Sequence, residues 1–401
     1  MLTTAEATAR ILAAVRPLDS VSVPLDDAVG RVLRQTVVAE RDQPPFDRVM
    51  MDGIALSFAE FETGKRTFEL QGMQAAGDTA MQLEDGKAIE IMTGASLPGG
   101  ADCIVPVERI TVNEHGAHIE ANYPAELRQF VHARGSDHKK STELLSAGTR
   151  VTAMDIAIIA SCGLADVSVA ALPSISVIST GNELVAAGKE IEDHQVRLSN
   201  GPALVAMLKD SGFAGAEHEH LVDEVDTLRE RIAGHLERSD VLVLSGGVSM
   251  GKADYVPEVL ADLGVVVDFH KISQKPGKPM WFGIGPKGQA VFALPGNPVS
   301  TLVCCRQYVI PALQHMAGMK PAMPQFASLT QDVTFKPQLT NFLPVRLLSN
   351  AAGQVLAMPV QTNTSGDFAA LHGTDGYVEL AADQTVFKAG TTVPLHRWRL
   401  G

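Results

Sequence analysis

The chain has 401 residues, of which 45% are hydrophobic and 20% charged, a composition typical of a globular protein with a large core. Its formal net charge of −13 argues against a general nucleic-acid binder, because no basic field would recruit phosphate backbones. Apolar runs such as Val241–Leu244 are too short to span a bilayer, and the N-terminal segment lacks the basic start and apolar run of a signal peptide. We therefore expect a cytoplasmic protein with no nucleic-acid or membrane partner.

The length suggests two or three domains, and the first part of the chain contains two different patterns. Residues 1–43 and 136–165 have helical patterns, so we expect one helical linker domain that is split in the sequence. Asp155 is a candidate N-cap in its second half. Residues 44–135 carry short alternating runs separated by Gly, Pro and Asn, which predicts a small N-terminal β domain.

The second part of the chain predicts an α/β domain over residues 166–317. The expected strands are 174–179, 241–244, 265–270 and 290–294, and the expected helices are 201–210, 225–237, 257–263 and 299–316. Such strands alternating with helices indicate a mainly parallel sheet covered on both faces. Residues 318–401 alternate again and carry turn signals, which predicts a C-terminal β-barrel or sandwich. The fold class is therefore a multidomain α/β protein with a central, mainly parallel α/β sandwich.

The strongest local motif is the glycine-rich segment Ser245–Asp254, which follows a strand and precedes a helix. Glycines there let backbone N–H groups approach a phosphate, and a helix N-terminus favours negative charge. Gly246, Gly251 and Lys252 match the P-loop spacing, but Ala253 stands where a P-loop needs a hydroxyl for Mg²⁺. We therefore exclude a Walker-type nucleoside triphosphatase. A purely structural turn remains the alternative to a phosphate site.

Two more loops follow expected strands of the α/β domain. In Lys275–Pro279 the prolines fix the loop while two lysines are free to face an anion, although a solvated surface turn is the alternative. In Leu294–Ser300, Asn297 can cap the next helix and Pro298 suits its first turn, and capping alone could explain the segment. Because binding sites of such sheets lie at the carboxyl ends of strands, we expect all three loops to share one edge.

Carboxylates accompany these loops. Glu183, Asp223, Glu224 and Asp254 all fall near expected strand ends. Oxygen ligands at such a place suit Mg²⁺ that is also bound to a substrate phosphate. Each of these acids alone could be a helix cap or a solvated charge, but together they predict that two or more contact a cation.

Read together, the motifs resemble the molybdopterin molybdenumtransferase family, the bacterial MoeA type related to the gephyrin E domain. Six segments occur in the family's order and approximate spacing: Pro44–Gly53, Thr93–Ala95, Thr180–Glu183, Ser245–Asp254, Lys275–Pro279 and Leu294–Pro298. The resemblance implies a molybdopterin-binding central domain and a C-terminal β-barrel. It also implies an elongated homodimer, in which the partner's β domain completes the active-site cleft.

The resemblance further implies insertion of molybdenum from molybdate into adenylylated molybdopterin, with release of AMP and assistance by Mg²⁺. A molybdopterin adenylyltransferase would be the upstream partner. The implied catalytic residues are Asp52, Glu183, Asp223, Asp254, Lys275 and Lys278, with Glu183, Asp223 and Asp254 as metal ligands. The implied cofactor-binding residues are Thr93, Thr180, Gly181, Ser245, Gly246, Gly247, Ser249, Gly251, Pro295, Gly296, Asn297 and Pro298.

The chain departs from the family pattern at four positions. Val49 and Ile54 replace a serine and a tyrosine, while Asn182 and Leu198 each replace an aspartate. Two missing acids near the expected cation site could weaken Mg²⁺ binding or accompany a preference for tungstate. Two alternatives therefore stay open: a molybdopterin adenylyltransferase, and a paralogue that binds molybdopterin without turnover.

Overall fold

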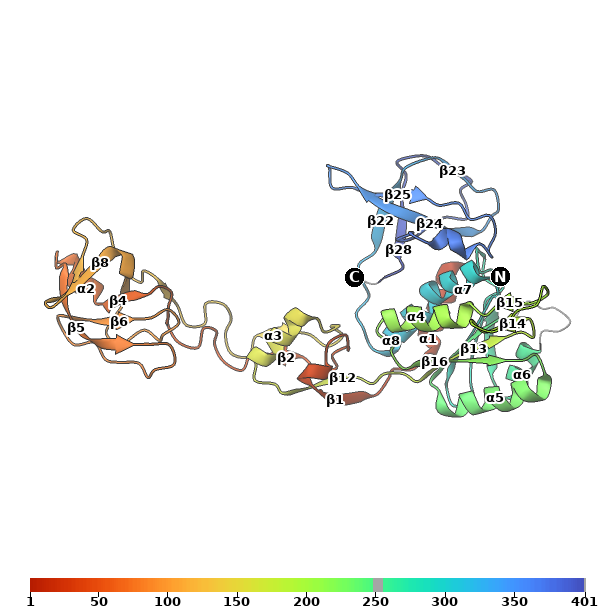
Figure 1. Ribbon diagram of the computed structural model, residues 1–401, viewed down its shortest axis with the longest axis horizontal. Helices are drawn as coiled ribbons and strands as arrows, with labels where there is room; N and C mark the ends of the chain where they lie inside the picture. The colour runs from red at the N-terminus through yellow and green to blue at the C-terminus, as the bar shows by residue number, and fades with distance from the viewer. Residues whose placement is uncertain (248–254, 400–401) are drawn as a thin grey trace.

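The computed structural model describes residues 1–247 and 255–399. The molecule is elongated, with a β domain at one end, a small unit in the middle, and the α/β and C-terminal domains together at the other end (Figure 1). No helix in the described ranges has the length and apolar character needed to cross a bilayer.

The α/β domain is built on a six-stranded sheet with the order β16-β13-β17-β21-β20-β18. The strands are β13 (Ile175–Thr180), β16 (Ala216–Leu221), β17 (Val241–Ser245), β18 (Val266–His270), β20 (Trp281–Ile284) and β21 (Ala290–Leu294). The first four in sheet order are parallel, and β20 lies antiparallel to both β21 and β18. The prediction of a mainly parallel sheet is therefore confirmed.

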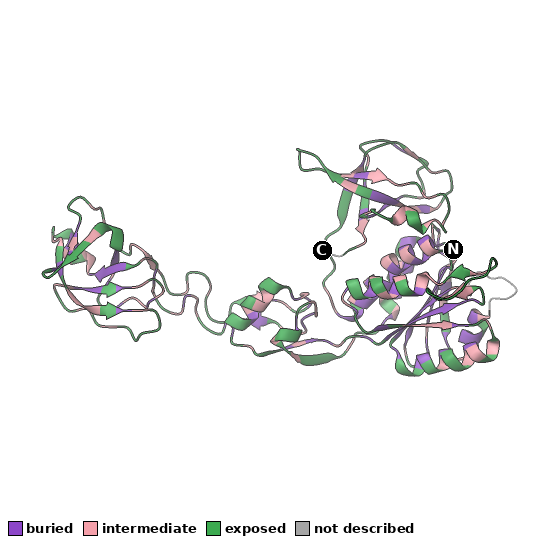
Figure 2. Cartoon of the chain, viewed as in Figure 1, coloured by how far each residue is buried: buried purple, intermediate pink, exposed green. Residues whose placement is uncertain are grey.

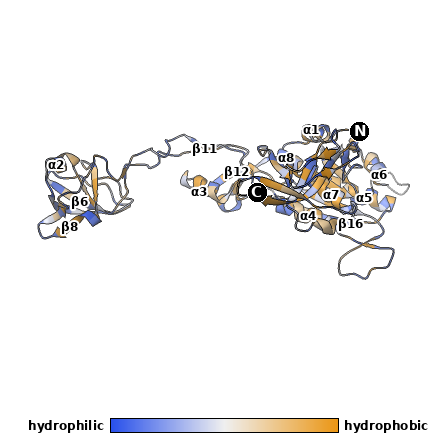
Figure 3. Cartoon of the chain, turned by 90° about the horizontal axis from the view of Figure 1, so that it is seen from above, coloured by the Kyte–Doolittle hydropathy of each residue, from blue (hydrophilic) through white to orange (hydrophobic). Residues whose placement is uncertain are grey.

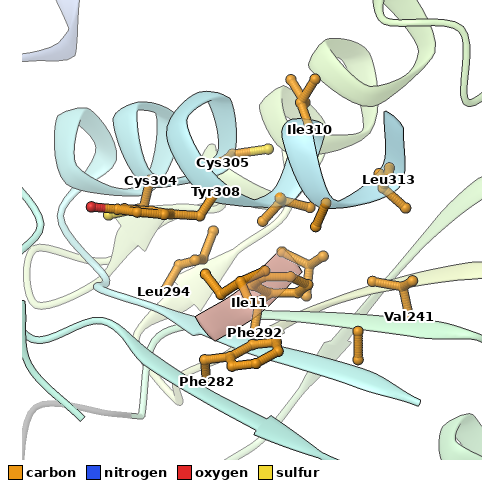
Figure 4. Packing of buried hydrophobic residues seen from close by; sticks show 14 of the residues in the cluster. Ile11, Val241, Phe282, Phe292, Leu294, Cys304, Cys305, Tyr308, Ile310 and Leu313 are labelled. Atoms are coloured by element: carbon orange, nitrogen blue, oxygen red, sulfur yellow. The ribbon is translucent and has the colours of Figure 1, made fainter. Parts of the chain in front are cut away.

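Helices cover both faces of this sheet (Figure 1). One face packs against α1 (Thr4–Ala14), α4 (Asn200–Asp210), α7 (Pro298–Cys304) and α8 (Ile310–Met316), and the other against α5 (Val225–Arg238) and α6 (Val256–Asp262). On the first face Ile11, Phe292 and Tyr308 belong to one buried cluster, part of which Figure 4 shows. Every residue of the central strands β17 and β21 is buried, and all of them except Ser245 are apolar. The buried strands are purple in Figure 2.

The N-terminal segment differs from the expectation that residues 1–43 are helical. Its first helix, α1, belongs to the α/β core instead, since Ala7 and Ile11 pack there. The chain then forms β1 (Ser20–Pro24), which pairs with β12 (Asp166–Ala170). This pairing joins segments that are distant in sequence, so no local pattern reveals it.

The middle unit contains little of the helix expected over residues 136–165. It holds α3 (Ala153–Ser161) and the paired short strands β2 (Val37–Val38) and β11 (Glu143–Leu145). The N-cap of α3 is Thr152, whereas Asp155 is the third helical residue and completes a capping box with it. The expectation that Asp155 is the N-cap is therefore wrong by three positions.

The chain has two β domains, one before and one after the α/β sheet in sequence. In the N-terminal domain the sheet order is β7-β4-β6-β5-β9-β8, with β4 (Gly53–Leu56), β5 (Thr67–Gln74), β6 (Lys87–Ile91), β7 (Cys103–Pro106), β8 (Ile110–Asn113) and β9 (Gly116–Ile119). The C-terminal strands are β22 (Gln325–Leu329), β24 (Thr340–Ser349), β25 (Val355–Pro359), β26 (Gly376–Leu380) and β28 (Thr392–Arg397). Pairing of β24 with both β25 and β26 closes them into a barrel, which confirms the barrel prediction.

Candidate active site

Two adjacent cavities lie where the strand ends of the α/β domain meet the barrel. The first, here called the lysine cavity, has a volume of about 580 Å³ and is lined by the 274–279 loop, the 295–300 turn and barrel residues 339–344 and 362–365. The second, here called the ribbon cavity, has a volume of about 370 Å³. It is lined by Ser179, residues 183–184 and 196–200, Ser245, residues 296–298 and Phe368. Asn297 lines both cavities, so they are neighbours across the 295–298 turn.

The lysine cavity contains both lysines of the predicted anion loop. Lys275 and Lys278 line it together with Pro295. Strand β19 (Gln274–Lys275) pairs with β24 of the barrel, and this pairing connects the loop to the second wall of the cavity. The expected shared edge for the 275–279 and 295–298 loops is thus present.

A buried side chain holds the lysine loop in place. Gln274 is fully buried, and its Nε2 donates a hydrogen bond to the Pro276 carbonyl at 3.1 Å. The hydroxyl of the buried Tyr308 donates to Gln274 Oε1. Gly277 has φ +91°, and a Cβ there would clash with Cys304 Sγ and lie 2.7 Å from Gln274 Nε2. The loop conformation therefore depends on glycine at this position.

Gly277→Ala should lower the free energy of unfolding by about 2–4 kcal/mol, because it adds a steric clash to backbone strain. Gly390→Ala is the matched control, since Gly390 has φ +84° and a Cβ added there would meet no atom within 4 Å. The control should cost only about 1–2 kcal/mol, the strain term alone. Chemical denaturation of both variants measures the difference, and equal losses would contradict the steric argument.

The ribbon cavity is organised by Asn200, which begins α4. Its Nδ2 lies 3.0 Å from Ser245 Oγ, 2.7 Å from the Gly296 carbonyl oxygen and 3.3 Å from Thr301 Oγ1. One amide group therefore ties together the ends of β17 and β21 and the first turns of two helices. No local sequence signal identifies this role.

The glycine-rich turn begins with two glycines in the left-handed region. Gly246 and Gly247 have φ +100° and +66°. A Cβ at Gly246 would lie 2.7 Å from the Thr180 carbonyl oxygen, and one at Gly247 would lie 2.7 Å from Val256 Cγ2. Both positions therefore need glycine. Ser249, Gly251 and Asp254 lie outside the described residues.

The 295–298 turn is held to the barrel. Asn297 is the N-cap residue of α7, as expected, but its side chain makes no cap bond. Its Nδ2 donates to Ser365 Oγ at 2.8 Å instead. The Val299 N–H donates to the Ser365 carbonyl at 3.0 Å. Pro298 occupies the first helical position, as expected. Ser365 is thus a cavity residue that only the fold reveals.

The structure places some of the predicted acidic residues near the ribbon cavity. Glu183 lines the ribbon cavity, and a Cβ at Gly181 would lie 2.7 Å from both of its carboxylate oxygens. Asn182 Oδ1 accepts a hydrogen bond of 3.0 Å from the Asp223 N–H, which fixes the adjacent strand end. Within residues 1–247 and 255–399, no group of three or more His, Cys, Asp or Glu residues could hold a metal ion. Of the predicted metal ligands, only Glu183 and Asp223 lie in these ranges.

Asp52 and Thr93 lie together, but not at these cavities. Both belong to the N-terminal β domain, at the opposite end of the molecule from the α/β domain (Figure 3). The Thr93 N–H and hydroxyl each donate to Asp52 Oδ1 at 2.7 Å. These bonds lower the pKa of the Asp52 carboxyl, the backbone donor having the larger effect. Within one chain, this hydrogen-bonded pair therefore lies away from the two cavities.

Matches to known protein families and relatives cover almost the whole chain. Family models described as the MoeA N-terminal region (domain I and II), a probable molybdopterin binding domain and the MoeA C-terminal region (domain IV) match residues 2–163, 176–315 and 327–398. The molybdopterin molybdenumtransferase of Synechocystis is 39% identical, with 94% of this chain and 95% of that protein covered. That of Staphylococcus aureus strain Mu50 is 30% identical, with 97% and 94% covered.

Solved structures agree with this assignment. A crystal structure of the molybdopterin biosynthesis MoeA protein from Pyrococcus horikosii matches with a TM-score of 0.83 at 28% identity, covering 100% of both chains. A second structure, from Pyrococcus horikoshii OT3, matches with a TM-score of 0.82 at 25% identity and covers 98% of this chain and 99% of that one. The chain belongs to the MoeA family and is a molybdopterin molybdenumtransferase of molybdenum cofactor biosynthesis.

Proposed function

We propose that this transferase inserts molybdenum from molybdate into adenylylated molybdopterin and releases AMP. The observation that carries the proposal is the pair of cavities that meet at Asn297, one with two lysines and one with apolar and acidic side chains. A substrate with anionic groups and planar rings needs both kinds of surroundings within one cleft.

The lysines and the glycine turn would bind the anionic groups. Lys275 and Lys278 offer point charges to molybdate or to substrate phosphates from a loop that Gln274 holds rigid. The Gly246–Gly247 turn lets backbone N–H groups approach a phosphate. Charges placed before the reaction need little rearrangement as negative charge develops, so preorganisation would be the main catalytic contribution of the chain.

A magnesium ion would be held by carboxylates at the strand ends. Gly181 allows the Glu183 carboxylate to lie back over the end of β13, and Asp223 follows the neighbouring β16. These oxygens suit Mg²⁺, which commonly takes one or two protein carboxylates and completes its shell with phosphate oxygens and water. Bound there, the ion would neutralise phosphate charge, and Asp254 would be a further ligand.

Asn182→Asp should lower the Mg²⁺ concentration for half-maximal activity about three- to tenfold, because it adds a carboxylate beside Glu183. The hydrogen bond from the Asp223 N–H can persist, since Asp also accepts at this atom position. Asn113→Asp is the matched control: its Oδ1 accepts from the His115 N–H at 2.8 Å in the N-terminal β domain. An equal shift in both variants, or none in Asn182→Asp, would contradict a cation site at Glu183.

The functional unit would be a homodimer in which Asp52 and Thr93 of one subunit complete the partner's cleft. The separation of this pair from the cavities of its own chain supports that arrangement. The substrate would come from a molybdopterin adenylyltransferase acting upstream.

The direct test is AMP release from adenylylated molybdopterin, measured with and without molybdate and Mg²⁺. Release should require both, and the absence of molybdate-dependent release from folded protein would contradict the proposal. Replacing molybdate by tungstate in the same assay measures oxyanion preference. Pyrophosphate formed from ATP and molybdopterin would point to adenylyl transfer instead.

A further inference from the structure

The ribbon cavity contains an exposed aromatic side chain to which the proposed reaction gives no role. Phe368 comes from the barrel, at the start of the short 3₁₀ turn η4 (Phe368–Leu371), and is 50% exposed. Single exposed apolar side chains are common on protein surfaces. Phe368 differs from a scattered surface residue because it lines a cavity shared with Glu183 and Asn200.

Phe368 is presented by an anchored segment. Leu371, at the other end of η4, packs against the buried cluster of Val299, Val303, Phe342 and Tyr377. Phe368 is outside that cluster, and within the described ranges none of the ring-to-ring contacts involves it. Its ring is therefore held at the cavity without a protein ring stacked on it.

The α/β domain supplies further apolar side chains to the same cavity. Leu184, Val196 and Leu198 line it from the ribbon of β14 (Leu184–Val185) and β15 (Val196–Arg197) and the residue that follows it. Backbone bonds of 2.8 Å from Val196 to Glu183 and 2.9 Å from Leu198 to Val185 hold the ribbon together. The cavity thus has apolar contributions from two domains.

The two cavities differ in the charged side chains that line them, and so in the ligand groups they favour. Arg197 brings a cation to the ribbon cavity, but its Nη1 already donates to the carbonyls of Ala186 and Lys189 at 3.1 and 2.7 Å. Lys275 and Lys278 line the other cavity. Anionic groups are therefore favoured in the lysine cavity. The apolar side chains of the ribbon cavity favour an uncharged planar group, in addition to the cation proposed at Glu183.

We propose that Phe368 is a specificity-determining residue that stacks on a planar heteroaromatic ring of the substrate bound in the ribbon cavity. The inference rests on the proposed function, which supplies two such rings, the pterin and the adenine. A volume of about 370 Å³ accommodates either ring. Leu184, Val196 and Leu198 exclude water from the bound ring.

Phe368→Ala should raise the KM for adenylylated molybdopterin about tenfold with a smaller change in kcat, since stacking on an aromatic side chain contributes binding. Phe368→Trp should retain the wild-type KM, because the planar surface remains. Phe368→Leu should resemble Phe368→Ala, because an aliphatic side chain lacks that surface. Phe326→Ala is the matched control, since Phe326 lies on β22 of the same barrel and is 54% exposed.

Equilibrium titration with AMP alone and with molybdopterin alone separates the two ring sources. Loss of AMP affinity in Phe368→Ala identifies adenine as the stacked ring, and loss of molybdopterin affinity identifies the pterin. Unchanged binding of both ligands, or wild-type kinetics in Phe368→Leu, would overturn stacking. These titrations need no turnover, so a wild type that binds but releases no AMP would contradict the proposed reaction without affecting this test.

Discussion

Equal amounts of Asp52→Ala and Lys275→Ala subunits, mixed and allowed to exchange, should recover about a quarter of wild-type activity. Each variant alone should lose about a hundredfold or more in kcat/KM, because each removes a charge from every cleft. In a mixed dimer, one cleft combines an intact Lys275 with the intact Asp52 of the other subunit. Half the dimers are mixed and each has one such cleft, which gives the expected quarter.

The physical basis of this result is the distance between the two parts of the site within one chain. Asp52 and Thr93 lie in the N-terminal β domain, and Lys275 lines the cavity between the α/β domain and the barrel. These domains are at opposite ends of the molecule (Figure 1). The two Thr93 donors favour the ionised Asp52 carboxylate, so the β domain presents a fixed negative charge. An ionised carboxylate that is remote from the cavities of its own chain supports the proposal that it serves a second subunit.

Asp78→Ala is the matched control for this experiment. Asp78 is an exposed acid of the same domain, whose Oδ2 accepts a 2.7 Å bond from the Ala75 N–H. Its replacement should leave activity near wild type. Recovery should follow subunit exchange in time, measured as AMP release after mixing. No recovery in verified mixed dimers would exclude a shared cleft, and full activity of Asp52→Ala would remove this carboxylate from the site.

Local periodicity predicts four of the six strands of the α/β sheet, but not β16 or β20. Strands β17 and β21 are fully buried, so their sequences are nearly continuous apolar runs, and α5 has a separate apolar stripe. Local patterns fail where tertiary contacts decide the structure. The α1 helix packs in a core formed by later residues, and β1 pairs with β12 far along the chain. Neither contact leaves a periodic signal in its own segment.

The candidate site, like the fold, can be predicted only where it depends on neighbouring residues in the sequence. Gly246, Gly247 and the lysine loop can be identified because turns with positive φ and anion loops need particular residue types in consecutive positions. Gln274 and Ser365 cannot, since a buried amide or a hydroxyl is meaningful only beside its partners. Asn200 is the clearest example, because the three groups it contacts are separated from it by tens of residues.

Asn200→Ala should reduce kcat/KM about a hundredfold and lower the free energy of unfolding by about 1–3 kcal/mol. The stability loss comes from leaving the Gly296 carbonyl and Ser245 Oγ without their shared donor. The activity loss comes from a different source. The lost bonds set the relative positions of the β17 and β21 ends, and small misplacement of binding groups is costly in catalysis.

Two comparison variants separate these effects. Asn350→Ala removes a side chain that donates to Gln354 Oε1 and accepts from two N–H groups in a barrel turn, so it should cost similar stability with wild-type kinetics. Asn200→Asp keeps size but replaces the donor with an acceptor facing the Gly296 carbonyl oxygen, so it should lose at least as much activity as Asn200→Ala. Thermal denaturation and molybdate-dependent AMP release are measured on all three. If Asn200→Ala loses stability but keeps wild-type kcat/KM, this amide supports the fold alone and the strand ends hold their catalytic positions without it.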